Sequence, residues 1–122
     1  MLTLPPSVRI FLARGPTDMR KGIDGLCALA RDVVGEDPFT GHLFAFANRR
    51  RDTVKILVWD RSGFWLFMKR LERGTFAWPR EGGRERRVEM RSRELYGLLE
   101  GLDLESARWR ARMDGLPAHA GA

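Results

Sequence analysis

Cysteine, histidine and long apolar runs are scarce in this chain of 122 residues. Its one cysteine, Cys27, excludes an intramolecular disulfide framework. Only His42 and His119 accompany it, so the residues for a cysteine and histidine zinc site are missing. No run of about 18 apolar residues and no basic leader with an apolar stretch occur. We therefore expect an unexported cytoplasmic protein with no membrane partner.

Lysine is also rare, since 19 of the 22 basic residues are arginine and only Lys21, Lys55 and Lys69 are lysine. Arginine makes bidentate hydrogen bonds to phosphates and base edges, so this bias suits a nucleic-acid partner. A GC-rich coding sequence also favours arginine over lysine, and the ratio alone leaves both explanations open.

The basic excess is concentrated in one part of the chain. Up to Asn48 there are 5 basic and 5 acidic residues, from Arg49 to Arg93 there are 14 and 6, and beyond Arg93 there are 3 and 5. An acidic partner is therefore expected to bind the central segment.

The stretch His42–Pro79 is rich in β-branched and aromatic residues and predicts three or four strands separated by arginine-bearing turns. If Asp60–Gly63 closes a hairpin, Trp59 faces Phe64, Leu57 faces Leu66, and both faces of the hairpin are mostly apolar. Each face therefore needs a helix, another sheet or a partner chain to cover it, and two helices are the simplest solution.

Further elements flank this sheet. Val8–Ala13 predicts a first strand, and Thr17 is expected to cap a long amphipathic helix that ends near Gly35. Gly22 lies in the apolar arc of that helix, which indicates close packing against the sheet. Thr75–Trp78 predicts an aromatic last strand.

The C-terminal part begins with Arg80–Arg87, a stretch without apolar residues that predicts a solvated loop. Val88–Met90 predicts a short edge strand, and Ser92 is expected to cap a second helix. That helix has one apolar face, made by Leu95, Leu98, Leu99 and Leu102.

The predicted fold is α+β. A single domain over residues 1–104 holds a mainly antiparallel sheet of about 4–6 short strands, one long helix after the first strand and a shorter C-terminal helix. Residues 105–122 are predicted to form a flexible C-terminal tail.

Catalysis is not indicated. The acidic candidates Asp18, Asp24, Asp52 and Asp60 do not form a convergent pair for two metal ions, because the first two lie on different sides of one helix and the last two bound turns. Cys27 borders the apolar arc and is interpreted as a core residue. We expect no enzyme activity, no metal and no cofactor.

Four blocks of the sequence are specific, namely TDMRKGIDGL from Thr17, GHLF from Gly41, KRLERGTFAWP from Lys69 and LLEG from Leu98. They resemble blocks of the small Orf2-like (TnpB) accessory proteins of the IS66 family of bacterial insertion sequences. The resemblance runs from about Leu4 to Asp103. One departure is Leu104, which stands where the family commonly has an aromatic residue, and the next tryptophan is Trp109.

The resemblance implies an accessory factor in transposition and DNA recombination of a mobile element, encoded beside a separate DDE transposase. Two hypotheses follow. In the first, the protein binds DNA in the bacterial cytoplasm, on the nucleoid, and phosphates are contacted by Arg49, Arg50, Arg51, Arg61, Lys69, Arg70 and Arg73. Trp59, Trp65 and Trp78 can stack on unpaired bases if they are exposed.

In the second hypothesis the protein is an adaptor that binds the transposase and has little direct DNA contact. The family motif places Asp18, Arg20, Lys21 and Asp24 as candidate surface contacts, and Arg20 and Asp24 are spaced for an i,i+4 ion pair. Homo-oligomerisation stays open under both hypotheses.

Overall fold

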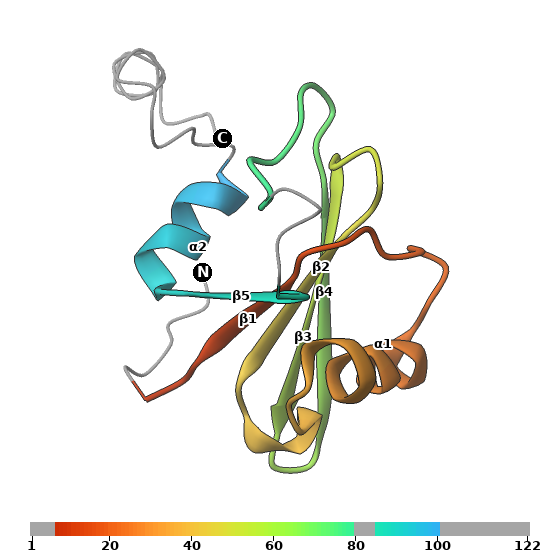
Figure 1. Cartoon of the computed structure of the whole chain (residues 1–122), viewed down its shortest axis with the longest axis vertical. Coiled ribbons are helices and arrows are strands. Elements are labelled where there is room, and N and C mark those ends of the chain that lie inside the picture. Colours follow the sequence, from red (N-terminus) through yellow and green to blue (C-terminus); the bar gives the residue numbers. More distant parts are fainter. Residues whose placement is uncertain (1–6, 80–84, 101–122) are drawn as a thin grey trace.

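One five-stranded sheet organises the structure, a computed structural model that describes residues 7–79 and 85–100. The strand order is β4-β3-β2-β1-β5 (Figure 1). The strands are β1 (Ile10–Ala13), β2 (Leu43–Ala47), β3 (Thr53–Asp60), β4 (Gly63–Arg70) and β5 (Arg87–Met90). Only β1 and β2 pair in parallel, and the other pairs are antiparallel. The predicted α+β class is confirmed.

The helices lie on opposite sides of this sheet (Figure 1). Between β1 and β2, α1 (Ile23–Leu29) continues into a wider π-helical segment, η1 (Ala30–Val34), and a 3-10 turn, η2 (Pro38–Thr40), follows. After β5 comes α2 (Ser92–Leu99). None of the helices in the described ranges is long and apolar enough to cross a membrane.

Strand alternation divides the buried side chains into two cores, one under each helix. On the α1 side, Leu26, Cys27 and Ala30 pack against Phe11 and Phe44. The core on the α2 side contains Ile10, Leu12, Leu43, Ala45, Ala47, Val54, Ile56, Phe76, Trp78, Leu95 and Leu98. The two covering helices predicted for the hairpin are present, but they cover the central strands, and the outer strand β4 keeps Trp65, Phe67 and Met68 exposed.

The β3–β4 hairpin has the predicted register, with Trp59 opposite Phe64 and Leu57 opposite Leu66. The turn at Asp60–Gly63 holds Arg61 in the left-handed region, at φ 43°. Short-range alternation and a turn-forming sequence were sufficient to predict this element.

The long helix is shorter than predicted. It begins at Ile23 with Gly22 as its N-cap, and Thr17 lies six residues upstream, where it is buried and caps nothing. The packing role expected for Gly22 is wrong as well, since a Cβ built on it would meet no heavy atom within 4 Å. The helix ends as predicted at Gly35, whose φ is 83°.

The segment after β4 corrects another prediction, because Thr75–Trp78 forms no strand. Its aromatic residues instead fold over the α2 side of the sheet, where Phe76 is 2% exposed. The Trp78 ring is buried too, and its Nε1 donates to the carbonyl oxygen of Ala13 at 2.9 Å. The alternation therefore indicated burial correctly and the backbone conformation wrongly.

In the C-terminal part, the predicted edge strand is β5, paired antiparallel with β1. Helix α2 starts at Ser92, and Arg91 takes the N-cap position that was predicted for the serine. Leu95 and Leu98 are buried as expected. Residues 80–84 of the predicted loop, Leu102 and the tail 105–122 lie outside the described residues.

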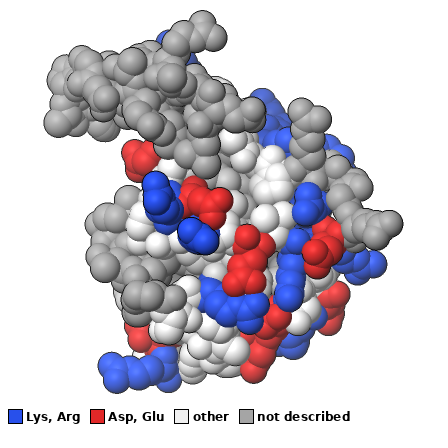
Figure 2. All heavy atoms as spheres, turned by 60° about the vertical axis from the view of Figure 1, so that its left-hand side comes forward, with Lys and Arg blue, Asp and Glu red and all other residues white. Residues whose placement is uncertain are grey.

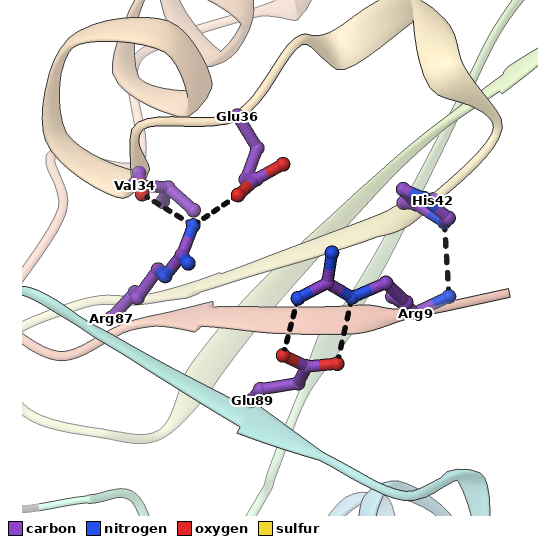
Figure 3. Close-up of polar contacts among 6 residues, drawn as sticks. All are labelled: Arg9, Val34, Glu36, His42, Arg87 and Glu89. Atoms are coloured by element: carbon purple, nitrogen blue, oxygen red, sulfur yellow. Dashed lines mark hydrogen bonds and ion pairs between the residues drawn. The ribbon is translucent and has the colours of Figure 1, made fainter.

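Polar contacts tie β5 to the α1 side of the molecule (Figure 3). Arg9 Nε and Nη2 donate to the Glu89 carboxylate at 2.9 and 2.8 Å, and Arg87 pairs with Glu36. The Arg9 and Arg87 guanidinium carbons lie 4.9 and 5.0 Å from the centroid of the buried Phe11 ring. These contacts fix the edge strand over the core.

Candidate nucleic-acid interface

One end of the sheet gathers the central arginines. There β1, β2 and β4 end and β3 and β5 begin, because β1 and β2 are parallel and their neighbours run the other way. The β2–β3 loop and the segment after β4 lie together at this end (Figure 1). We call it the arginine end, and its members are Arg14, Arg49, Arg50, Arg51, Arg70 and Arg73.

The side chain of Asn48 holds the loop that carries three of these arginines. Its Oδ1 accepts from the backbone nitrogens of Asp52 and Thr53 at 3.1 and 3.2 Å, and its Nδ2 donates to Asp52 Oδ1 at 2.7 Å. The same amide lowers the pKa of the Asp52 carboxyl by hydrogen bonding to its charged form. The loop conformation is therefore fixed without any ligand.

Arg51 is the most constrained residue of the loop. Its φ of 62° lies in the left-handed region, which is uncommon for a residue with a long side chain. Backbone hydrogen bonds hold it there, since its nitrogen donates to the Asn48 oxygen at 3.1 Å and its oxygen accepts from Phe76 at 2.7 Å. Arg51 is half-buried, whereas Arg49 and Arg50 are exposed. The loop thus presents two exposed guanidinium groups and one that is half-buried.

A shallow pocket of about 180 Å³, including space open to solvent, lies between this loop, the segment that follows β1 and Trp78. Its floor includes Ala47 and the buried Trp78. Of the described side chains around it, three are arginines and none is acidic. The lining residues are Arg14, Gly15, Pro16, Ala47, Asn48, Arg49, Arg51 and Trp78. Such a concave, cationic surface is suited to a phosphate group.

Arg14 is the site residue that sequence reasoning missed. It directly follows β1, and its Nε donates to the carbonyl oxygen of Glu85 at 2.7 Å. Only the parallel pairing of β1 with β2 brings it beside Arg49 and Arg51. An arginine directly after a predicted strand is a weak signal, because the partner strand is not known from the sequence.

The remaining predicted phosphate contacts differ in position. Arg70 and Arg73 lie at the arginine end, because Arg70 pairs with Thr53 and Leu71 donates to the Asp52 oxygen at 2.8 Å. Lys69 Nζ donates to the carbonyl oxygen of Leu99 at 2.6 Å, at the C-terminus of α2. The Lys69 ammonium group can still add positive charge beside Arg70, at the arginine end.

Arg61 is not brought together with the others. It lies in the β3–β4 turn, at the opposite end of two eight-residue strands, so roughly 25 Å separate it from the β2–β3 loop. The side of the molecule that carries α2 shows basic and acidic side chains interspersed (Figure 2). The arginine end holds acidic side chains as well, since Arg50 Nε lies 3.9 Å from Asp52 Oδ2 and Arg70 Nη2 lies 3.5 Å from Glu72 Oε2.

The family-motif residues border the same end. The backbone nitrogen of Thr17 donates a hydrogen bond to the carbonyl oxygen of Ala47 at 2.7 Å. Lys55 Nζ donates to the carbonyl oxygens of Met19 and Lys21 at 2.8 and 2.9 Å. A lysine of β3 therefore fixes the segment that leads into α1, a role that sequence reasoning missed because the two residues are 34 and 36 positions away.

The charges of this motif pair differently from the prediction. Arg20 contacts Asp18, with Nη2 2.7 Å from Oδ2, and not Asp24. Hydrogen bonds from the Arg20 side chain and backbone lower the pKa of Asp18 to about 2. Asp24 and Lys21 are exposed. The i,i+4 pair fails because the helix begins only at Ile23, so Arg20 precedes it.

Cys27 and the possible metal ligands can be assessed within the described part of the chain. The Cys27 side chain is buried, and burial raises the pKa of its thiol, which disfavours the reactive thiolate. Within residues 7–79 and 85–100 no group of three or more histidine, cysteine or acidic side chains is arranged to hold a metal ion.

Comparison with known proteins gives a consistent result. A family model described as IS66 Orf2 like protein matches residues 8–109. The uncharacterized protein y4hO of Sinorhizobium fredii (strain NBRC 101917 / NGR234) is 38% identical over 104 residues, which cover 84% of this chain and 88% of the relative. The uncharacterized protein y4jC of the same strain is 37% identical over 98 residues, covering 79% and 80%. No solved structure matches this chain.

Proposed function

The chain belongs to the IS66 Orf2-like family of insertion-sequence proteins, and on that premise we propose that it is a non-catalytic accessory factor of transposition that binds DNA through the arginine end. It acts in the bacterial cytoplasm, on the nucleoid. The element's DDE transposase is its proposed protein partner.

The observation that carries the DNA proposal is the hydrogen-bonded loop Asn48–Asp52. Two of its three consecutive arginines, Arg49 and Arg51, line a pocket together with Arg14, and none of the described lining residues is acidic. Because the loop is already ordered, less conformational entropy is lost when it binds phosphates. Arg70 and Arg73 extend the positive charge along the same end, with Glu72 as the acidic residue between them.

A titration of labelled duplex DNA with the purified full chain tests this proposal. Replacing Arg49, Arg50 and Arg51 by glutamine should weaken binding strongly, because three phosphate contacts are removed while most of the side-chain length is kept. Arg61→Gln is the matched control at the other end of the hairpin and should bind nearly as the wild type does. Equal affinities of the triple variant and the wild type would show that this loop does not contribute to DNA binding.

An adaptor that binds the transposase is the second candidate, and the exposed apolar residues of β4 favour it. Trp65, Phe67 and Met68 are 56, 39 and 64% exposed on the edge strand of the sheet. In that case the transposase should co-purify with the wild type and be lost from variants of these side chains, while DNA affinity of the isolated protein stays negligible.

A further inference from the structure

The outer strand β4 carries two exposed aromatic rings on the α2 side of the sheet. Trp65 and Phe67 are two residues apart in the strand, so both side chains project to the same side of the sheet, about 6.8 Å apart along the backbone. Helix α2 buries Leu95 and Leu98 against the inner strands, and neither aromatic ring belongs to that core. The two rings therefore form an open surface at the edge of the sheet, which we call the aromatic platform.

The rings of the aromatic platform are oriented in advance. Their planes differ by 11° and their centroids lie 5.9 Å apart. The indole Nε1 of Trp65 donates to Asp60 Oδ2 at 2.8 Å, which fixes the ring on the strand. An indole ring held in this way loses little entropy when a flat group stacks on it.

Cations flank the aromatic platform at both ends of β4. Lys69 is the next residue on the same side of the sheet, and Arg61 lies in the turn at the other end. The Asp60 carboxylate beside Trp65 already accepts from the indole. Aromatic rings between cations suit an anionic chain with flat groups better than they suit an apolar protein surface.

We propose that the aromatic platform stacks unpaired bases of single-stranded DNA. Duplex DNA keeps its base faces inside the helix, so only an unpaired strand can offer them to a sheet surface. The inference rests on the proposed function, since β4 runs from the aromatic platform to Arg70 at the arginine end. An unpaired strand can thus continue from the duplex held there.

The test uses the full chain, a labelled oligothymidylate and a labelled duplex of the same length. Replacing Trp65 and Phe67 by leucine should weaken oligothymidylate binding about 5- to 100-fold per ring and leave duplex binding unchanged. Trp65→Phe should keep most of the affinity, which a general loss of packing would not allow. Met68→Ala, an exposed change on the other side of β4, should affect neither probe.

The outcomes separate the two proposals. If the wild type binds neither probe, the proposed function fails and this inference fails with it. If it binds duplex DNA through the arginine loop while the leucine variants bind oligothymidylate normally, only the aromatic platform is refuted. Leucine variants that lose transposase capture or change oligomeric state at unchanged oligothymidylate affinity would assign the surface to a protein partner.

Discussion

Asp18 and Arg20 show how single residues shape the family-motif segment. The Asp18 carboxylate accepts from both the side chain and the backbone nitrogen of Arg20. A pKa of about 2 follows from these bonds. Because the pKa is lowered on folding, the stabilising contribution of Asp18 is present above the ordinary pKa of aspartate, near 3.9, and is lost as the pH falls toward 2.

Replacing Arg20 by methionine should raise the pKa of Asp18 part of the way to its ordinary value. The backbone hydrogen bond from residue 20 remains in the variant, so the rise should be incomplete. NMR titration of the Asp18 carboxyl in both proteins measures it. An unchanged pKa in the variant would show that the side-chain pair is not formed in solution.

Asn48 is expected to matter for binding although it carries no charge. Asn48→Ala removes the acceptor and donor that fix the arginine loop. The free energy of unfolding should fall by about 1–3 kcal/mol, because two part-buried backbone donors lose their partner. Duplex affinity should fall as well, since the loop must then be ordered on binding.

Chemical denaturation and the duplex titration, done on the same preparation, check both effects. Arg50→Gln supplies the contrast, because it should weaken DNA binding without lowering stability. A stable Asn48→Ala variant with wild-type affinity would contradict the view that the loop is ordered in advance.

At the level of elements, the end of the first helix depends on the backbone of Gly35. Its φ of 83° is open to glycine but costs an alanine about 1–2 kcal/mol. Gly35→Ala should therefore lower the midpoint of thermal unfolding. Gly63→Ala is the control, because that position has no positive φ and a Cβ there would meet nothing within 4 Å. Similar losses in both variants would refute the assignment.

The elements also show what a sequence can and cannot predict. The hairpin register followed from alternation and a turn within one short stretch. The start of α1 was missed, because Thr17 and Asp18 have the pattern of a helix start while the buried Thr17 instead bonds to Ala47. Phe76 and Trp78 were assigned to a strand because local alternation reports burial and not sheet pairing.

The candidate site was predictable only in its local part. Three consecutive arginines between two strands were visible in the sequence. The position of Arg14 beside the loop was not visible, because it arises from the parallel pairing of two strands with 29 residues between them. For the same reason the separation of Arg61 from the loop required the strand order and lengths.

For the whole molecule, one end of a single sheet carries the arginine end, and the exposed Trp65 and Phe67 lie along the adjoining edge strand β4. Charge counted over the sequence located the excess between residues 49 and 93. The fold brings part of this excess together, since the loop after β2 and the end of β4 meet, whereas Arg61 lies at the opposite end of the hairpin. The most direct test therefore asks whether the position of an arginine, and not only its charge, determines DNA binding.

That test is the salt dependence of duplex binding for three proteins. Against the wild type, glutamine at Arg49, Arg50 and Arg51 should reduce the slope of log affinity against log salt by about 3, at −0.9 per phosphate contact. Glutamine at the exposed Arg31, Arg61 and Arg93 removes the same charge elsewhere and should leave the slope nearly unchanged. Equal slopes for the two triple variants would contradict a DNA site at the arginine end.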